Sequence, residues 1–228
     1  MQRYSFIEGN FPREFLLLQG SGCRWKKCKY CDYYLDTSSK PFEVNKNVLN
    51  LINGKSGVLD IINSGSAIEL DNETIFLLKK IIIEKNISTV WFESHWMYRN
   101  LLEKFSKQFI ENVTIKWRTG VETFNPKLRN YINKGIPENV TPLEIKKYFS
   151  GVCLLVGFEG QQLADIVNDI KIAEENFEYF SVNVFIENST KVKRDNVLIN
   201  NFIDKIYPDL LKCKKAEILL NNTDLGVG

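Results

Sequence analysis

The chain has 228 residues, of which 44% are hydrophobic and 25% charged, and its formal net charge is +2 at pH 7. This length allows one large domain or two small ones. The nearly balanced charge by itself indicates neither a nucleic-acid nor a membrane-surface partner. No apolar run is long enough to span a bilayer, and the N-terminal residues contain no apolar signal core. We therefore expect a cytoplasmic protein.

Strand-like and helix-like segments alternate along the chain. We predict strands at 14–19, 56–66, 88–94, 113–123, 151–158, 179–188 and 216–221, and helices at 72–86, 96–109, 125–135, 141–149, 161–176 and 194–212. Such alternation requires crossover connections and therefore a mostly parallel sheet. A full eight-fold barrel typically needs about 250 residues. The sequence thus predicts an α/β fold, a partial (β/α)6 TIM-like barrel, as a single domain over 1–228.

Three of the five cysteines lie in one short stretch, GCRWKKCKYCDYY at 22–34. Cys23, Cys28 and Cys31 directly follow the first predicted strand, at the end of a parallel sheet where active residues gather. Thiolates select zinc or iron–sulfur clusters. A closed zinc site needs a fourth ligand, which would be His95, Cys153 or Cys213. A cubane cluster with three thiolates keeps one open iron. Three ordinary cysteines are the remaining alternative, and Cys153 and Cys213 are interpreted as structural.

Several segments in the expected order resemble the radical S-adenosylmethionine superfamily. The cysteine motif carries Tyr30 before Cys31 and a two-residue gap between the last two cysteines, although its first gap holds four residues where that family usually has three. NSGS at 63–66, RTGVETFNPKLRNYINKG at 118–135 and LLVGFEGQQLADIVNDI at 154–170 resemble further family segments. The resemblance covers most of the chain.

The resemblance implies a 4Fe-4S cluster on Cys23, Cys28 and Cys31, with S-adenosylmethionine bound at the open iron. Reductive cleavage of the cofactor would give a 5′-deoxyadenosyl radical, while the protein orients the reactants. An electron donor such as flavodoxin or ferredoxin is implied as a partner. The residues expected at the cofactor are Tyr30, Asn63, Ser64, Gly65, Ser66, Arg118, Glu122, Gly157, Asn183 and Phe185.

Each of these side chains also has a purely structural interpretation. Ser64 and Ser66 could close a turn. Arg118 and Glu122 point to one face of a strand and could bind the methionine carboxylate and amino groups or form a buried ion pair. Glu93 and His95 end the third predicted strand and are candidate catalytic residues, although a lone histidine is also a common capping residue.

The cysteine loop resembles that of the queuosine lyases of queuine salvage. This resemblance implies cleavage of the N-glycosidic bond of queuosine or its 5′-phosphate, a small nucleoside-like substrate without direct contact to nucleic acid. Alternatives are a glycyl-radical activating enzyme, a radical enzyme for another nucleoside or deazapurine, and a non-enzymatic metal-binding module. The expected substrate-binding residues combine acids with aromatic walls: Asp32, Tyr34, Asp36, Trp96, Phe158 and Glu159.

Overall fold

The predicted alternation of strands and helices is observed in the computed structural model, which describes residues 1–228. The chain forms two units. The first comprises residues 1–26, 33–117 and 223–228, and the second comprises residues 27–32 and 118–222. None of the helices is both long enough and apolar enough to cross a lipid bilayer.

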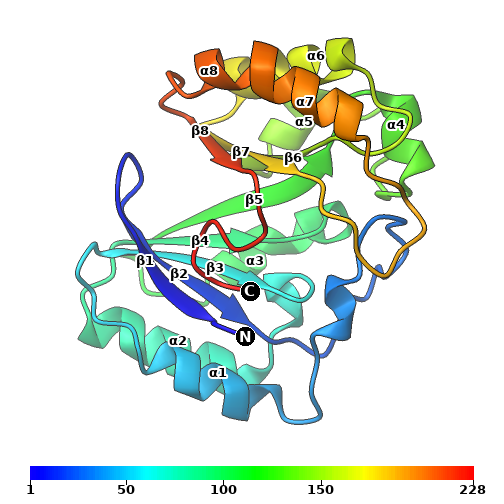
Figure 1. Cartoon of the computed structure of the whole chain (residues 1–228). Helices are drawn as coiled ribbons and strands as arrows, with labels where there is room; N and C mark the ends of the chain where they lie inside the picture. Colours follow the sequence, from blue (N-terminus) through cyan, green and yellow to red (C-terminus); the bar gives the residue numbers. More distant parts are fainter. The chain divides into compact units, whose positions relative to one another are not determined.

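The first unit contains the strands β1 (Tyr4–Ile7), β2 (Arg13–Leu18), β3 (Val58–Asn63) and β4 (Thr89–Glu93). β1 pairs antiparallel with β2, whereas β2, β3 and β4 are parallel neighbours. The helices are α1 (Pro41–Leu49), α2 (Asn72–Glu84) and α3 (Leu102–Ser106), with 3-10 turns η1 (Tyr33–Leu35), η2 (Ala67–Glu69) and η3 (Trp96–Leu101). α1 and α2 cover β1–β3 from one side (Figure 1).

Alternating apolar residues explain this packing. On β2 and β3, Leu16, Leu18, Leu59 and Ile61 are fully or almost fully buried. The adjoining helices bury Leu49, Leu78 and Ile82 in the same core. α2 begins where the sequence predicts, because the Asp71 carboxylate accepts a hydrogen bond from the Thr74 amide at 2.7 Å.

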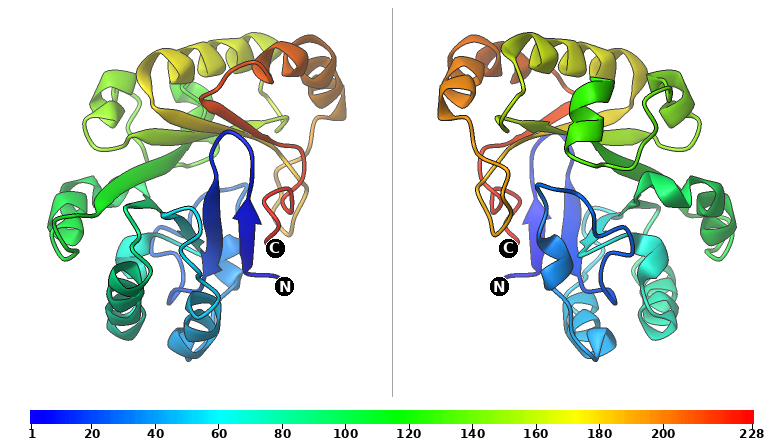
Figure 2. Two further views of the ribbon diagram at one scale, coloured as in Figure 1. Left: turned by 90° about the vertical axis from the view of Figure 1, so that its left-hand side faces the viewer. Right: turned by 90° about the vertical axis from the view of Figure 1, so that its right-hand side faces the viewer.

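The two ends of the chain lie side by side in the first unit (Figures 1 and 2). The Gly228 amide donates to the Gln2 carbonyl at 2.9 Å, and the Gln2 amide donates back at 3.2 Å. The Ser5 hydroxyl donates to the Leu225 carbonyl. The last residues thus satisfy backbone groups of the N-terminal edge of the sheet, which would otherwise be exposed.

β5 (Thr114–Glu122) runs from the first unit into the second. It is followed by β6 (Gly151–Val156), β7 (Tyr179–Val184) and β8 (Ala216–Leu219), each parallel to the preceding strand. The helices are α4 (Pro126–Tyr131), α5 (Pro142–Lys146), α6 (Leu163–Asn176), α7 (Asn196–Lys205) and α8 (Tyr207–Leu210). In each unit the strands follow sequence order, and the predicted α/β partial TIM-like barrel with mostly parallel strands is confirmed.

Some predicted elements differ from the structure. β1 and α1 were not expected from the sequence, because β1 is short and α1 carries polar residues among its apolar ones. The helix predicted at 96–109 begins as the 3-10 turn η3, and the helix predicted at 194–212 is divided at Ile206. Pro208 explains this division, since proline has no amide proton to continue the hydrogen bonds of a helix. The single-domain prediction stays a prediction.

One buried acid on α6 should make stability depend on pH. Asp169 accepts a hydrogen bond from the Phe124 amide at 2.7 Å, and its other carboxylate oxygen is buried without a partner. Burial raises the pKa of Asp169 from 3.8 to about 7, despite the lowering effect of hydrogen bonds from Thr123 and Phe124.

We predict that Asp169→Asn reduces the loss of stability between pH 4 and pH 7. In that range the folded wild type retains a proton that the unfolded chain loses, so its unfolding free energy should fall by up to about 1.4 kcal/mol per pH unit from this group. Urea unfolding of both proteins at several pH values measures the difference. Parallel pH profiles for the two proteins would contradict the shifted pKa.

Candidate active site

The three clustered cysteines lie in the loop that follows β2. Cys23 belongs to the first unit, and Cys28 and Cys31 to the second. All three are free thiols of intermediate exposure, and the Lys26 amide donates to the Cys23 sulfur at 3.4 Å. Three accessible thiols on one loop suit the donor chemistry of an iron–sulfur cluster. No three His, Cys, Asp or Glu side chains already stand in a metal-binding arrangement, so the ligand roles stay predictions.

The turn at 63–66, predicted to bind the cofactor, packs against the first cysteine. A Cβ atom on Gly65 would lie 3.1 Å from Cys23 Cα and would overlap the Glu69 carboxylate. Glycine is therefore required for this close approach. The Asn63 side-chain oxygen is buried and has no hydrogen-bond partner. A buried oxygen without a partner can accept a hydrogen bond from a donor group of a bound cofactor.

The two serines of this turn hold neighbouring main chain. Ser64 Oγ accepts from the Gly20 amide at 3.3 Å, and Ser66 Oγ accepts from the His95 amide at 2.9 Å. Each hydroxyl retains its own proton as a donor. Their predicted contact with the cofactor stays a prediction.

Glu69 connects the cysteine loop to this turn, and sequence reasoning did not identify it. Its Oε1 accepts from the Arg24 amide at 2.9 Å and from the Tyr98 hydroxyl at 2.7 Å, and its Oε2 accepts from the Ser66 amide at 2.9 Å. Burial and the hydrogen bond to Glu69 raise the pKa of Tyr98, so this hydroxyl remains a donor. One carboxylate thus ties the residue after Cys23 to η2 and η3.

The residues that follow β4 include both predicted catalytic side chains. Glu93 ends the strand and is partly exposed. His95 Nδ1 accepts from the Met97 amide at 3.2 Å, and the ring stacks on Trp25 of the cysteine loop with centroids 5.1 Å apart. In its neutral form His95 therefore carries its proton on Nε2. Trp96 is buried beneath the Arg99 guanidinium, 4.6 Å from its ring centroid. The catalytic and substrate roles of these residues stay predictions.

A cavity of about 550 Å³ lies beside Cys23 within the first unit. The Lys26 ammonium lies 4.7 Å from the ring centroid of Tyr34, a predicted substrate-binding residue, and both line this cavity. Its walls combine basic, aromatic and hydroxyl groups: Ser21, Gly22, Cys23, Arg24, Lys26, Tyr34, Thr37, Ile68, Glu69, Tyr98 and Leu101. Asp36 instead pairs with Arg3 at the base of the loop.

In the second unit, Tyr30 forms a buried network with Glu122 and Lys134. The Tyr30 hydroxyl donates to Glu122 Oε1 at 2.6 Å, and Lys134 Nζ donates to the same oxygen at 2.8 Å and to the Tyr30 hydroxyl at 3.0 Å. Burial, followed by the charge of Glu122, raises the pKa of Tyr30 well above its ordinary value. Lys134 was not predicted from the sequence, because its partners lie 12 and 104 positions away.

The backbone around Glu122 is adapted to this network. Glu122 has a φ of +65°, an uncommon value for a residue other than glycine, and the pairing of β5 with β6 is irregular between Gly120 and Glu122. A Cβ atom on Gly120 would overlap Glu122 Oε1 and lie 2.8 Å from Lys134 Nζ. Arg118, the other residue of the predicted pair, lies over the Tyr179 ring at 5.9 Å.

Polar contacts hold residues 27–32 within the second unit. The Asn133 side chain donates to the Lys27 carbonyl at 2.9 Å, and the Asn188 side chain donates to the Tyr30 carbonyl at 2.7 Å. Asp32 accepts from the Ser189 amide at 3.0 Å and from its hydroxyl at 2.8 Å. The segment with Cys28 and Cys31 is thus fixed by residues that follow α4 and β7.

The remaining predicted residues of the second unit have varied surroundings. Phe158 and Phe185 belong to a buried apolar cluster against which Tyr30 packs. Gly157 has a φ of +89°. Glu159 accepts from the Tyr131 hydroxyl at 2.6 Å on the surface. The Asn183 side-chain oxygen is buried without a partner, like that of Asn63 in the first unit. The cofactor- and substrate-binding roles of these residues stay predictions.

Comparison with known proteins identifies a close relative along the whole chain. A queuine lyase from Clostridium spiroforme, solved with S-adenosylmethionine and queuine bound, is 40% identical, with a TM-score of 0.95. The match covers 100% of this chain and 99% of that one.

More distant relatives share the fold or part of the sequence. Streptococcus suis SuiB is 15% identical over 92% of this chain and 50% of its own, with a TM-score of 0.57. The heme chaperone HemW of Buchnera aphidicola is 28% identical over 179 residues, and the match covers 65% of this chain. The chain spans 44% of that curated relative's length. No protein-family model matches the chain.

The buried pair of Glu122 and Lys134 allows a test of the network around Tyr30. Their side chains are only 7% and 10% exposed. We predict that Lys134→Met lowers the unfolding free energy by about 3 kcal/mol, because it leaves a buried carboxylate without its cation. Combining it with Glu122→Gln should cost less than the sum of the single changes. Urea unfolding of the four proteins measures this coupling. Strictly additive losses would show that the two side chains act independently.

Proposed function

This chain belongs to the queuine lyase family of radical S-adenosylmethionine enzymes, and we propose that it releases queuine from queuosine or queuosine 5′-phosphate by cleaving the N-glycosidic bond. The observation that carries this proposal is the 40% identity to a queuine lyase over the full length of both chains. The substrate of the proposed reaction is therefore a small molecule.

The residues of the chain fit the two groups that the family requires. We propose that Cys23, Cys28 and Cys31 hold a 4Fe-4S cluster, since they offer three accessible thiols on one loop. We propose that S-adenosylmethionine binds beside the Gly65 turn, with a donor group directed at the unpartnered oxygen of Asn63. When bound, these groups supply radical chemistry that removes a hydrogen atom from the substrate.

The protein's own side chains then orient the substrate. The deazaguanine edge of queuine presents two neighbouring donors, which pair well with a carboxylate. Among the expected acids, Asp36 is held by Arg3 and Asp32 by Ser189. We propose Glu93 as the carboxylate for this edge, because it ends β4 and functional residues gather at the carboxyl ends of parallel strands. His95 contributes an imidazole ring held by Met97 and Trp25.

Further partners complete the proposal. An electron donor such as flavodoxin or ferredoxin would reduce the cluster. The basic residues of the cysteine loop, Arg24, Lys26, Lys27 and Lys29, are exposed and suit an acidic protein. We propose that the enzyme acts in the cytoplasm on the free nucleoside or nucleotide and not on tRNA.

Replacing one loop cysteine tests the cluster. We predict that the wild type, reconstituted without oxygen, binds about four iron and four sulfide per chain. Cys23→Ser, Cys28→Ser and Cys31→Ser should each lose most of this iron, whereas Cys153→Ser and Cys213→Ser should retain it. Iron and sulfide analysis with visible absorption measures the result. One stoichiometric zinc in place of the iron would overturn the cluster.

The released base tests the substrate. Anaerobic incubation with S-adenosylmethionine, dithionite and either queuosine or queuosine 5′-phosphate should give queuine and 5′-deoxyadenosine, both measured by mass spectrometry. Guanosine and queuosine-containing tRNA should give no base. Glu93→Gln should raise KM for the substrate more than it changes binding of S-adenosylmethionine. Formation of 5′-deoxyadenosine with no base from any substrate would instead favour an activating enzyme.

A further inference from the structure

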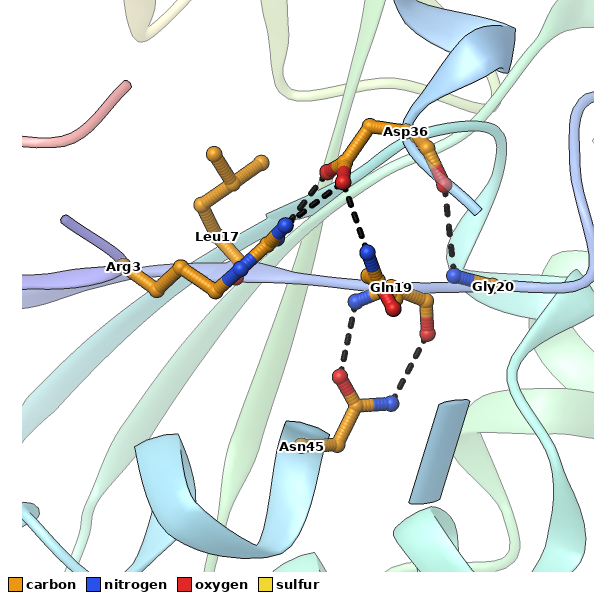
Figure 3. Close-up of polar contacts among 7 residues, drawn as sticks. Arg3, Leu17, Gln19, Gly20, Asp36 and Asn45 are labelled. Atoms are coloured by element: carbon orange, nitrogen blue, oxygen red, sulfur yellow. Dashed lines mark hydrogen bonds and ion pairs between the residues drawn. The ribbon is translucent and has the colours of Figure 1, made fainter. Parts of the chain in front are cut away.

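The cysteine loop is closed at its base by a polar cluster within the first unit. The loop leaves the sheet after Gln19 and returns at Asp36, and Gly20 forms a parallel bridge with Thr37. Figure 3 shows that Arg3, Gln19 and Asn45 gather around this closure, with the Asp36 carboxylate directed at Arg3 and Gln19. We refer to Arg3, Gln19, Asp36 and Asn45 as the loop clasp.

Asp36 makes the central contacts of the loop clasp. Arg3 donates from both guanidinium ends, with Nη1 2.9 Å from Oδ2 and Nη2 2.5 Å from Oδ1. Gln19 Nε2 donates to Oδ1 at 2.7 Å. The Arg3 and Asp36 side chains are 14% and 19% exposed. Burial alone would raise the pKa of Asp36, but the hydrogen bonds and charge of its partners lower it below 3.8. A paired, bidentate arrangement of this kind is geometrically specific.

The loop clasp is connected to the helices α1 and α2 through hydrogen bonds of Asn45. Asn45, fully buried on α1, accepts from the Gln19 amide at 2.7 Å and donates to the Gln19 carbonyl at 2.8 Å. Its Nδ2 also donates to Thr74 Oγ1 at 3.0 Å. Thr74 in turn donates to Asp71 at the start of α2. An unbroken chain of hydrogen bonds therefore runs from α2 through the end of β2 to the far end of the cysteine loop.

The contacts beyond the loop clasp lead toward the cysteines. The Gly20 amide donates to Ser64, in the turn whose Gly65 packs against Cys23. A displacement of Gln19 or Asp36 would therefore move both ends of the loop and the surface on which Cys23 rests. Apolar packing contributes little to the order of residues 33–35, because η1 buries none of its residues.

We propose that the loop clasp is a positioning device that holds the cysteine loop in its cluster-binding conformation. The proposal rests on the proposed function in so far as the loop carries the cluster. Three thiolates must bind one cluster together, and an open loop would lose conformational entropy when they do so. The loop clasp orders the loop when the protein folds, before the three thiolates bind a cluster. Asp36 then acts through the loop and not by contact with the substrate.

Loss of iron to a chelator tests this role. The variants are Asp36→Ala, Asp36→Asn and Arg3→Lys, the last of which keeps the charge but not the bidentate contact. The matched control is Asp60→Asn, which removes the buried pair of Arg13 and Asp60 in the same sheet, away from the loop. After anaerobic reconstitution, iron release from Asp36→Ala should be at least tenfold faster than from the wild type. Arg3→Lys should be intermediate, and Asp60→Asn should retain wild-type release even if its unfolding midpoint falls further.

Hydrogen exchange on the cluster-free proteins separates this proposal from the proposed function. Amides of residues 20–37 should exchange faster in Asp36→Ala than in the wild type, while those of β3 and β4 stay unchanged. Wild-type exchange and iron release in a folded Asp36 variant would overturn the loop clasp. If Asp36→Ala does not fold, Asp36→Asn and Arg3→Lys decide by the same two measurements. A wild type that binds no iron would refute the proposed function, whereas the exchange comparison would still decide on the loop clasp.

Discussion

The structure depends on holding three thiols in place on a loop that has almost no regular secondary structure. Between Gly20 and Thr37 the chain forms only the short turn η1, so its own backbone cannot fix the cysteines. Side chains from other elements therefore provide the order, with Glu69 binding the Arg24 amide and Asn188 binding the Tyr30 carbonyl. These contacts are directional hydrogen bonds, which specify position more sharply than apolar packing does.

Much of the fold follows from local patterns in the sequence, whereas the supports of the site do not. Apolar runs predict the strands β2 to β8, and the spacing of three cysteines predicts a metal-binding loop, because both signals lie within a few residues. Lys134 binds Tyr30 from 104 positions away, and Arg3 binds Asp36 from 33 positions away. No periodic pattern in the sequence links residues that lie so far apart along the chain. A lysine after a short helix is typical of a solvent-exposed surface until the fold buries it beside a carboxylate.

Because local sequence patterns do not reveal distant partners, some residues that were expected to be functional also have structural contacts in the fold. A strand end and a loop acid are reasonable candidates for a site, because functional residues gather at the carboxyl ends of parallel strands. Position alone does not show whether a side chain is already engaged. His95 caps η3, and Ser64 and Ser66 hold amides of neighbouring segments. The two serine hydroxyls act as acceptors in these contacts and keep their own protons as donors, so a supporting residue can also face a ligand.

The buried polar groups divide into two classes with different consequences. In the Glu122 network and the loop clasp, nearly every donor meets an acceptor, although Gln19 Oε1 is buried without a partner, and such connected networks give rigidity. Asn63 and Asn183, at the ends of β3 and β7, instead retain a buried oxygen without a donor. An unsatisfied acceptor costs roughly 1–3 kcal/mol, and a bound molecule with N–H or O–H groups recovers that energy. In the proposed function, this cost at Asn63 becomes part of the affinity for S-adenosylmethionine, which carries an ammonium group and ribose hydroxyls.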